Sequence, residues 1–175
     1  MEKSQIDLHN FAKENYFHEI DRKDKISNRI SQTTTTLTIL LGLVGISTKE
    51  IQYPFSNLEY IQLAALLVSL FYISKTIFYL MKFFIGFKYK YIAPSSIILK
   101  YYNDLVKYNS VDGKDNPDLL LIDYLIESYT DTTNNNIINN DKKSEYIYIA
   151  NENIVKSLPS VLSLGFLYLL QNIVN

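Results

Sequence analysis

The sequence of 175 residues contains no cysteine, which excludes disulfide bonds, thiolate metal sites and a cysteine nucleophile. Its net charge is −1, so no strong overall field attracts nucleic acid or an acidic substrate. The first thirty residues carry charges of both signs and no continuous apolar core, which argues against a cleaved secretory signal. No internal repeat is visible. These absences leave the distribution of apolar residues as the most informative feature of the chain.

The sequence also lacks the short motifs that carry catalysis. It has no nucleophile elbow, phosphate-binding loop, dinucleotide-binding loop or zinc signature. His9 and His18 stand nine positions apart without a partner motif. The carboxylates of Asp112, Asp115 and Asp118 miss the ligand spacing of a calcium-binding EF-hand. Because no set of acid, base and nucleophile is evident, we expect no enzyme, no metal and no cofactor.

Charge disappears from the sequence after residue 30. Residues 31–48 read SQTTTTLTILLGLVGIST and contain no charged side chain. Threonine and glycine alone weakly favour a strand, but the run does not alternate and exceeds the usual strand length of about 4–8 residues. As a helix it would be about 27 Å long, slightly shorter than the ~30 Å hydrocarbon core of a bilayer. Local thinning, or a lysine side chain at Lys49 reaching the headgroups, would accommodate the difference.

A second apolar run follows a short polar connector at residues 49–57, in which Pro54 is the helix breaker. The second run, residues 58–87, reads LEYIQLAALLVSLFYISKTIFYLMKFFIGF. Lys75 interrupts it within reach of the far interface, and Lys82 marks its exit. Two such runs predict a helical hairpin through a bilayer. A soluble protein with two buried core helices is the alternative interpretation.

Basic residues concentrate on the outer flanks of the two runs, whereas the connector carries only Lys49. By the positive-inside rule, both long flanks are cytoplasmic and the connector lies outside, which places the N-terminus in the cytoplasm. The residues that set this orientation are Arg22, Lys23, Lys25 and Arg29 before the hairpin, and Lys82, Lys88 and Lys90 after it.

The chain after the hairpin, residues 88–157, is predicted to be a helical cytoplasmic region. Apolar residues recur at helical spacing in segments 95–108, 118–129 and 144–157. Between the last two segments, residues 131–143 read DTTNNNIINNDKK, which has the composition of a polar, low-complexity loop.

The last segment, residues 158–175, reads LPSVLSLGFLYLLQNIVN and is uncharged. Its length fits either a third span or an apolar helix that contacts the membrane or the other helices. Ser160, Ser163 and Gln171 fall on one side, which suits packing against protein. The predicted division of the chain is a charged cytoplasmic helix at 1–30, a transmembrane hairpin at 31–87, a cytoplasmic helical region at 88–157 and the terminal apolar helix at 158–175.

Each apolar run of the hairpin carries a small or polar face at helical spacing. Lipid-facing polar residues are costly, so these faces should point toward protein or water. Packing between helices is one interpretation, because small residues let membrane helices approach closely. A water-lined pore is the other, and it needs several copies because one hairpin has too few walls. The faces are Thr35, Thr38, Gly42 and Gly45 in the first run, and Ala65, Ser69, Tyr72, Thr76 and Tyr79 in the second.

The segment FKYKYIA at residues 87–93 alternates lysine with tyrosine. This composition is typical of the belt where a membrane helix meets anionic headgroups, and it also suits stacking on bases beside phosphates. The interfacial or signal-binding candidates are Lys75, Lys82, Lys88, Tyr89, Lys90 and Tyr91, with Lys100, Tyr101 and Lys107 in the cytoplasmic region.

The order of these segments resembles the SLATT family of small two-span effectors from bacterial anti-phage systems. The residues that carry the resemblance are KENYFHEIDRKDKISNRISQTTTTLTILLGLVGI, 13–46, and the second span through FIGFKYKY, 84–91. The resemblance covers roughly residues 10–95. The later part of the chain matches the family only in length and helical character, and its terminal apolar segment exceeds a strict two-span plan.

The resemblance implies an all-α, homo-oligomeric pore in the bacterial inner membrane that disables an infected cell by abortive infection. Such effectors work beside a nucleotidyltransferase, whose nucleotide or short oligonucleotide product opens the channel or, in the Hailong type, holds it shut. The resemblance therefore implies a nucleotide-gated ion channel of antiviral defence. The alternative is a non-conducting membrane scaffold whose cytoplasmic helices recruit a partner protein.

Overall fold

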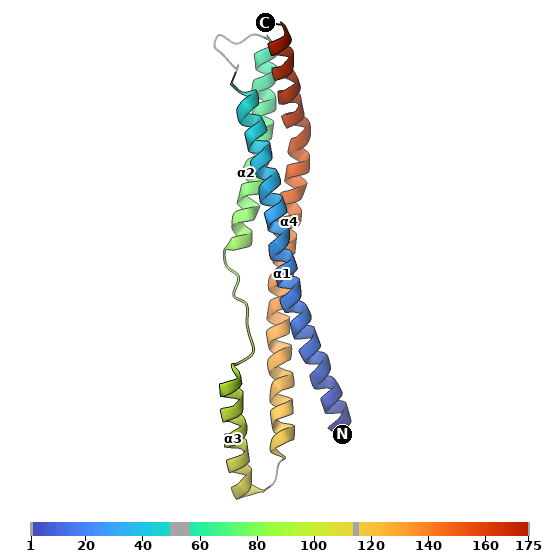
Figure 1. Ribbon diagram of the computed structural model, residues 1–175, viewed down its shortest axis with the longest axis vertical. Helices are drawn as coiled ribbons and strands as arrows, with labels where there is room; N and C mark the ends of the chain where they lie inside the picture. Colours follow the sequence, from blue (N-terminus) through green and yellow to red (C-terminus); the bar gives the residue numbers. More distant parts are fainter. Residues whose placement is uncertain (1, 50–56, 114–115, 175) are drawn as a thin grey trace. The chain divides into compact units, whose positions relative to one another are not determined.

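The computed structural model describes residues 2–49, 57–113 and 116–174, and this part of the chain contains four helices and no strand. The predicted all-α class is therefore confirmed for the described residues. The predicted helix breaker at Pro54 and the carboxylate at Asp115 lie outside them. The helices are α1 (Glu2–Ser47), α2 (Asn57–Phe84), α3 (Ser95–Asp112) and α4 (Pro117–Val174), as Figure 1 shows.

The threonine run that weakly favours a strand lies within the C-terminal third of α1. Threonine hydroxyls here donate to the backbone carbonyl four residues earlier, at distances of 2.9–3.0 Å. Each hydroxyl is satisfied within the helix and needs no further partner in an apolar environment. The residues concerned are Thr34, Thr35, Thr36 and Thr38.

The prediction of a polar loop at residues 131–143 is wrong, because α4 continues through this stretch as one helix of 58 residues. Asparagine is usually unfavourable inside a helix, since its amide competes for nearby backbone groups. Here the asparagine amides bond to distant parts of the chain instead, as described below. The same helix continues into the terminal apolar segment and passes through Pro159 without ending.

The contacts divide the chain into two compact units, each built from two separate stretches. The first unit contains residues 1–25 and 87–141, and the second contains 26–86 and 142–175. Both α1 and α4 contribute residues to each unit, whereas α2 belongs to the second and α3 to the first. The division into cytoplasmic and transmembrane segments rests on sequence topology and stays a prediction.

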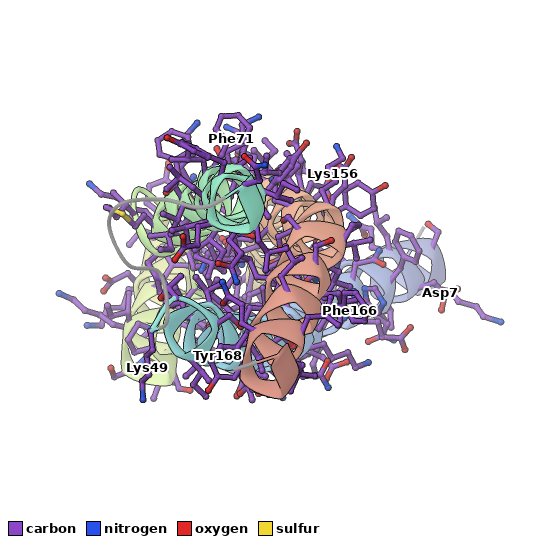
Figure 2. The ribbon with its side chains drawn as sticks, turned by 90° about the horizontal axis from the view of Figure 1, so that it is seen from above. Asp7, Lys49, Phe71, Lys156, Phe166 and Tyr168 are labelled. Carbon is purple, nitrogen blue, oxygen red and sulfur yellow. The ribbon has the colours of Figure 1, made fainter. Side chains whose placement is uncertain are left out.

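The second unit has an apolar core and an apolar exterior. Its outward side chains include Leu67, Phe78 and Phe166, and Figure 2 shows Phe71 on α2 directed away from the neighbouring helices. A water-soluble protein rarely exposes so much apolar surface. The core joins α1, α2 and α4 through Leu37, Leu40, Val44, Ile73, Leu80, Ala150, Ile154, Val161 and Leu164.

Among the described residues, three helices are long and apolar enough to cross a membrane: α1, α2 and α4. Together with the apolar exterior, they indicate a membrane protein. The third of these helices, α4, contains the terminal segment for which the sequence left two interpretations open, and its length and composition allow a span.

The first unit combines aromatic contacts with many polar side chains. The ring of Tyr129 on α4 lies 5.5 Å from that of Tyr16 and 5.7 Å from that of His9, both on α1. On the opposite edge of α4, Tyr124 packs against Tyr101 of α3 at 4.7 Å. Tyr129 therefore ties α1 to α4, and Tyr124 ties α3 to the same helix.

Candidate functional site

Polar side chains connect α2 with α4 inside the second unit, and we call this set the polar seam. The amides of Gln62 and Gln171 bond reciprocally, at 2.8 and 3.2 Å. The hydroxyl oxygens of Ser69 and Ser160 lie 2.8 Å apart. Thr76 completes the seam, and its hydroxyl oxygen lies 3.4 Å from the backbone carbonyl of residue 150. The three α2 members are fully buried, whereas Ser160 and Gln171 on α4 are half-buried.

One more side-chain bond joins α1 to the same set of helices. The hydroxyl of Thr33 donates to Oδ1 of Asn151 at 2.9 Å. Because Thr76 contacts the adjacent residue Ala150, these residues of α1, α2 and α4 lie at one level along the unit. On the side of this level toward Gln62, the uncharged residues 34–48 of α1 share a core with Val161 and Leu164 in the uncharged end of α4. The bonds therefore bring the charge-free parts of the three helices into register.

The structure treats the two predicted small or polar faces differently. On α2, Ser69 and Thr76 are fully buried against α4 of the same chain. The other members of that face, Ala65, Tyr72 and Tyr79, are half-buried. On α1, all four predicted residues are exposed: Thr35, Thr38, Gly42 and Gly45.

The predicted interfacial lysines of α2 lie over aromatic rings. Nζ of Lys75 is 4.9 Å from the ring centre of Phe71. Nζ of Lys82 is 4.6 Å from that of Phe78 and 5.9 Å from that of Tyr146 on α4. Such cation–π contacts position the amine while leaving it accessible, since both lysines are exposed.

Within the first unit, asparagines of α4 form hydrogen bonds with residues 88–91, the segment predicted to lie at the membrane interface. The backbone N–H of Lys90 donates to Oδ1 of Asn136 at 3.0 Å, and the amide of Asn136 donates back to the carbonyl of Lys90 at 3.0 Å. The amides of Asn135 and Asn139 both donate to the carbonyl of Lys88. We call these contacts the asparagine clamp, because α4 side chains hold an extended backbone as a neighbouring strand would.

The tyrosines of the same segment complete the clamp. The hydroxyl of Tyr89 donates to Oδ1 of Asn140 at 2.7 Å, and the amide of Asn140 donates to the buried carboxylate of Glu19 on α1 at 2.8 Å. Nζ of Lys23 donates to the hydroxyl of Tyr91 at 3.1 Å. The segment from residue 88 to residue 91 is thus connected to both α1 and α4.

Two pKa shifts accompany these contacts. Burial raises the pKa of the Tyr89 hydroxyl above its ordinary value of 10.0, and the hydrogen bond to Tyr91 raises the pKa of Lys23. Because the raised pKa of Tyr89 favours its neutral form in the folded chain, this contribution to stability is present at neutral pH. It is lost as the pH rises above about 10.

Lys90 pairs with Asp131 at 2.7 Å, so one predicted basic candidate already has an acidic partner. The other lysine of the segment, Lys88, is exposed. On α3, Lys100 and Lys107 are exposed, and Tyr101 packs against α4 as described above. The structure therefore separates the predicted basic set into α2, clamp and α3 groups.

Sequence reasoning placed Ser160 and Gln171 on a face that packs against protein, and this is confirmed by their bonds to α2. Ser163, predicted on the same face, is exposed and donates to the carbonyl of Pro159 in its own helix. The asparagine clamp was missed. The sequence feature that could have revealed it is the spacing of the asparagines at 135, 136, 139 and 140, which puts their side chains on one face of a helix.

Within residues 2–49, 57–113 and 116–174, no group of three or more potential ligands is placed to hold a metal ion. Comparison with protein-family models, curated proteins and solved structures found no match to this chain.

The polar seam predicts that Gln62→Leu destabilises the bundle by about 1–2 kcal/mol, because the half-buried amide of Gln171 loses its partner. The double variant with Gln171→Leu should recover most of this loss, because no unpaired amide remains. Unfolding of the detergent-solubilised protein by a denaturing detergent measures both effects. Gln32→Leu is the control, since Gln32 is exposed on α1. Equal effects of Gln32→Leu and Gln62→Leu would contradict the role of the amide pair.

The asparagine clamp predicts that Asn136→Leu leaves the N–H and carbonyl of Lys90 without their partner and costs about 1–3 kcal/mol. Hydrogen exchange at the Lys90 amide should accelerate, while exchange in the middle of α2 stays unchanged. Asn134→Leu is the matched control, because Asn134 is an exposed neighbour in the same helix. If Asn134→Leu accelerates the Lys90 amide as much as Asn136→Leu does, the clamp is not formed.

Proposed function

We propose that this chain is a membrane effector whose copies assemble around a pore, with the exposed face of α1 toward the pore. The observation that carries the proposal is the position of Thr35, Thr38, Gly42 and Gly45, which we call the α1 face. Residues are about 100° apart around a helix, so this face lies opposite the buried residues of α1. Those buried residues are Leu37, Leu40 and Val44.

All four residues of the α1 face are exposed among the described residues. A Cβ atom added at Gly42 or Gly45 would meet no atom within 4 Å. Glycine inside a helix costs about 0.5–1 kcal/mol relative to alanine, so packing within this chain gives no reason for either residue. Small residues and hydroxyls are the usual composition of contacts between membrane helices and of water-lined surfaces. A second copy or a pore provides such a surrounding, and lipid does not.

The same reasoning assigns the small or polar face of α2, which contains Ser69 and Thr76, to packing within the chain. Ser69 and Thr76 are buried against α4, so water in a central pore would not reach them without opening the bundle. The sequence alone left both faces as candidates for either role. The contacts of the single chain favour α2 for internal packing and α1 for assembly and conduction.

The family resemblance is the basis for three further parts of the proposal. These are a gating signal, a nucleotidyltransferase partner and a location in the bacterial inner membrane. The resemblance supports a nucleotide or short oligonucleotide as the ligand. Among the predicted basic residues, Lys100 and Lys107 of α3 are exposed and suit contacts with phosphates. The lysines at 88 and 90 belong to the clamp, and Lys90 pairs with Asp131.

A membrane scaffold is the second candidate function, and a feature of α3 favours it. Ile97, Leu99, Val106, Tyr108 and Val111 expose apolar side chains along this helix. Exposed apolar patches of this kind mark surfaces that bind other proteins. A scaffold would recruit its partner through α3 without conducting ions.

The pore proposal predicts that Thr38→Leu abolishes most ion flux through liposomes that contain the purified protein, because leucine replaces a hydroxyl at the proposed pore surface. Thr36→Leu is a matched control. Both threonines are exposed on α1 and both donate to a carbonyl four residues earlier, but Thr36 lies off the α1 face. We expect Thr36→Leu to retain at least about half of the wild-type flux.

Flux is measured with and without added nucleotides or short DNA, and the oligomer size of each variant is followed by cross-linking. Unchanged flux in Thr38→Leu would contradict the assignment of the α1 face. Absence of flux from the correctly inserted wild-type protein under every condition would favour the scaffold.

A further inference from the structure

The three membrane-length helices become charged at the same end of the polar seam. Beyond the level of Thr33, Thr76 and Ala150, on the side away from Gln62, the second unit contains four basic side chains and one acidic side chain. At the other end of the seam, residues 48–60 contain one lysine and two glutamates. The charged residues at the basic end are Arg29, Lys82, Lys142 and Lys143, with Glu145.

One acidic side chain, Glu145, stands against four basic ones at this end. Glu152 and Lys156 lie within the span of the seam and pair with each other at 2.6 Å. No carboxylate of the described residues forms an ion pair with Lys75 or Lys82. The end of the bundle where α2 exits therefore carries a net positive charge that faces outward, and this is the charge complement of an anionic membrane surface.

The exit of α2 also keeps an apolar exterior where the other helices have become polar. Phe78, Met81, Phe84 and Ile85 are exposed there, and Phe84 has 70% of its surface accessible. Lys82 lies among them, with Nζ held over the rings of Phe78, Tyr79 and Tyr146. Apolar and aromatic side chains beside an exposed amine suit the boundary between acyl chains and headgroups.

We propose that this surface, formed by Phe78, Lys82 and Phe84 of α2 with Tyr146 of α4, binds anionic phospholipids. The aromatic rings and acyl chains make the apolar contact, and the phosphate accepts hydrogen bonds from the amine of Lys82. The rings hold Lys82 at the boundary of α2 and α4, which reduces the loss of side-chain freedom on binding. The inference rests on the proposed membrane insertion, and the test separates the two.

The chain contains no tryptophan, so a single introduced tryptophan reports on one position. Phe84→Trp places the reporter at the proposed surface, and Phe71→Trp places one on the exposed face of α2 within its apolar part. The full chain is reconstituted into vesicles of phosphatidylcholine mixed with phosphatidylglycerol. Bromine on the acyl chains of one lipid or the other shows which lipid contacts each tryptophan.

We expect brominated phosphatidylglycerol to quench Phe84→Trp about fivefold more effectively, per lipid present, than brominated phosphatidylcholine. This factor corresponds to one lysine at an anionic surface. The preference of Phe84→Trp for phosphatidylglycerol should fall to about onefold when Lys82→Gln is added. It should persist with Lys49→Gln, which removes a lysine just after the C-terminal end of α1. Phe71→Trp should be quenched equally by both lipids.

Two results would overturn the lipid site. The first is equal quenching of Phe84→Trp by both lipids, and the second is an absence of quenching at Phe84→Trp while Phe71→Trp is quenched. The second result would show that protein, such as another copy of the chain, covers this surface. If Phe71→Trp also escapes quenching, the chain is not inserted, and the proposed membrane function fails together with the lipid site.

Discussion

The polar contacts between α2 and α4 set the arrangement of the second unit. In a bilayer the hydrophobic effect does not drive helices together, so their register depends on close packing and on hydrogen bonds between side chains. The Gln62–Gln171 pair, the Ser69–Ser160 contact and the approach of Thr76 to Ala150 connect α2 and α4 at three successive levels. With Thr33 bonded to Asn151, they bring the uncharged parts of three helices together.

In this register, the polar side chains of α2 face α4, whereas the small polar face of α1 is exposed. The polar side chains of α2 bond to α4 inside the chain, whereas the threonines and glycines of the α1 face form a small, exposed surface. The same register places basic side chains of all three helices at one end of the bundle. Assembly through α1 and lipid contact at the exit of α2 are therefore proposals about different surfaces of one unit.

Sequence patterns predicted the membrane-length helices, because these depend on long apolar runs. The prediction was wrong for the asparagine-rich stretch of α4, where contacts with distant residues decide the local structure. The uncharged residues 31–48 and the apolar run of α2 are visible from composition alone. The asparagine-rich stretch of α4 has the composition of a loop, and it is helical because its amides bind the backbone at residues 88 and 90. Burial of Ser69 could not be distinguished from pore lining, because the same spacing serves both.

The central claim is that α1, α2 and α4 cross the membrane as one three-helix bundle. Because the chain has no cysteine, single cysteines at Ser4, Asn57 and Asn172 can be labelled in intact cells with a membrane-impermeant thiol reagent. Three crossings place the two ends on opposite sides, so Asn57→Cys and Asn172→Cys should react from outside. Ser4→Cys should react only after permeabilisation. Protection of Asn172→Cys together with Ser4→Cys, while Asn57→Cys reacts, would contradict the crossing of α4.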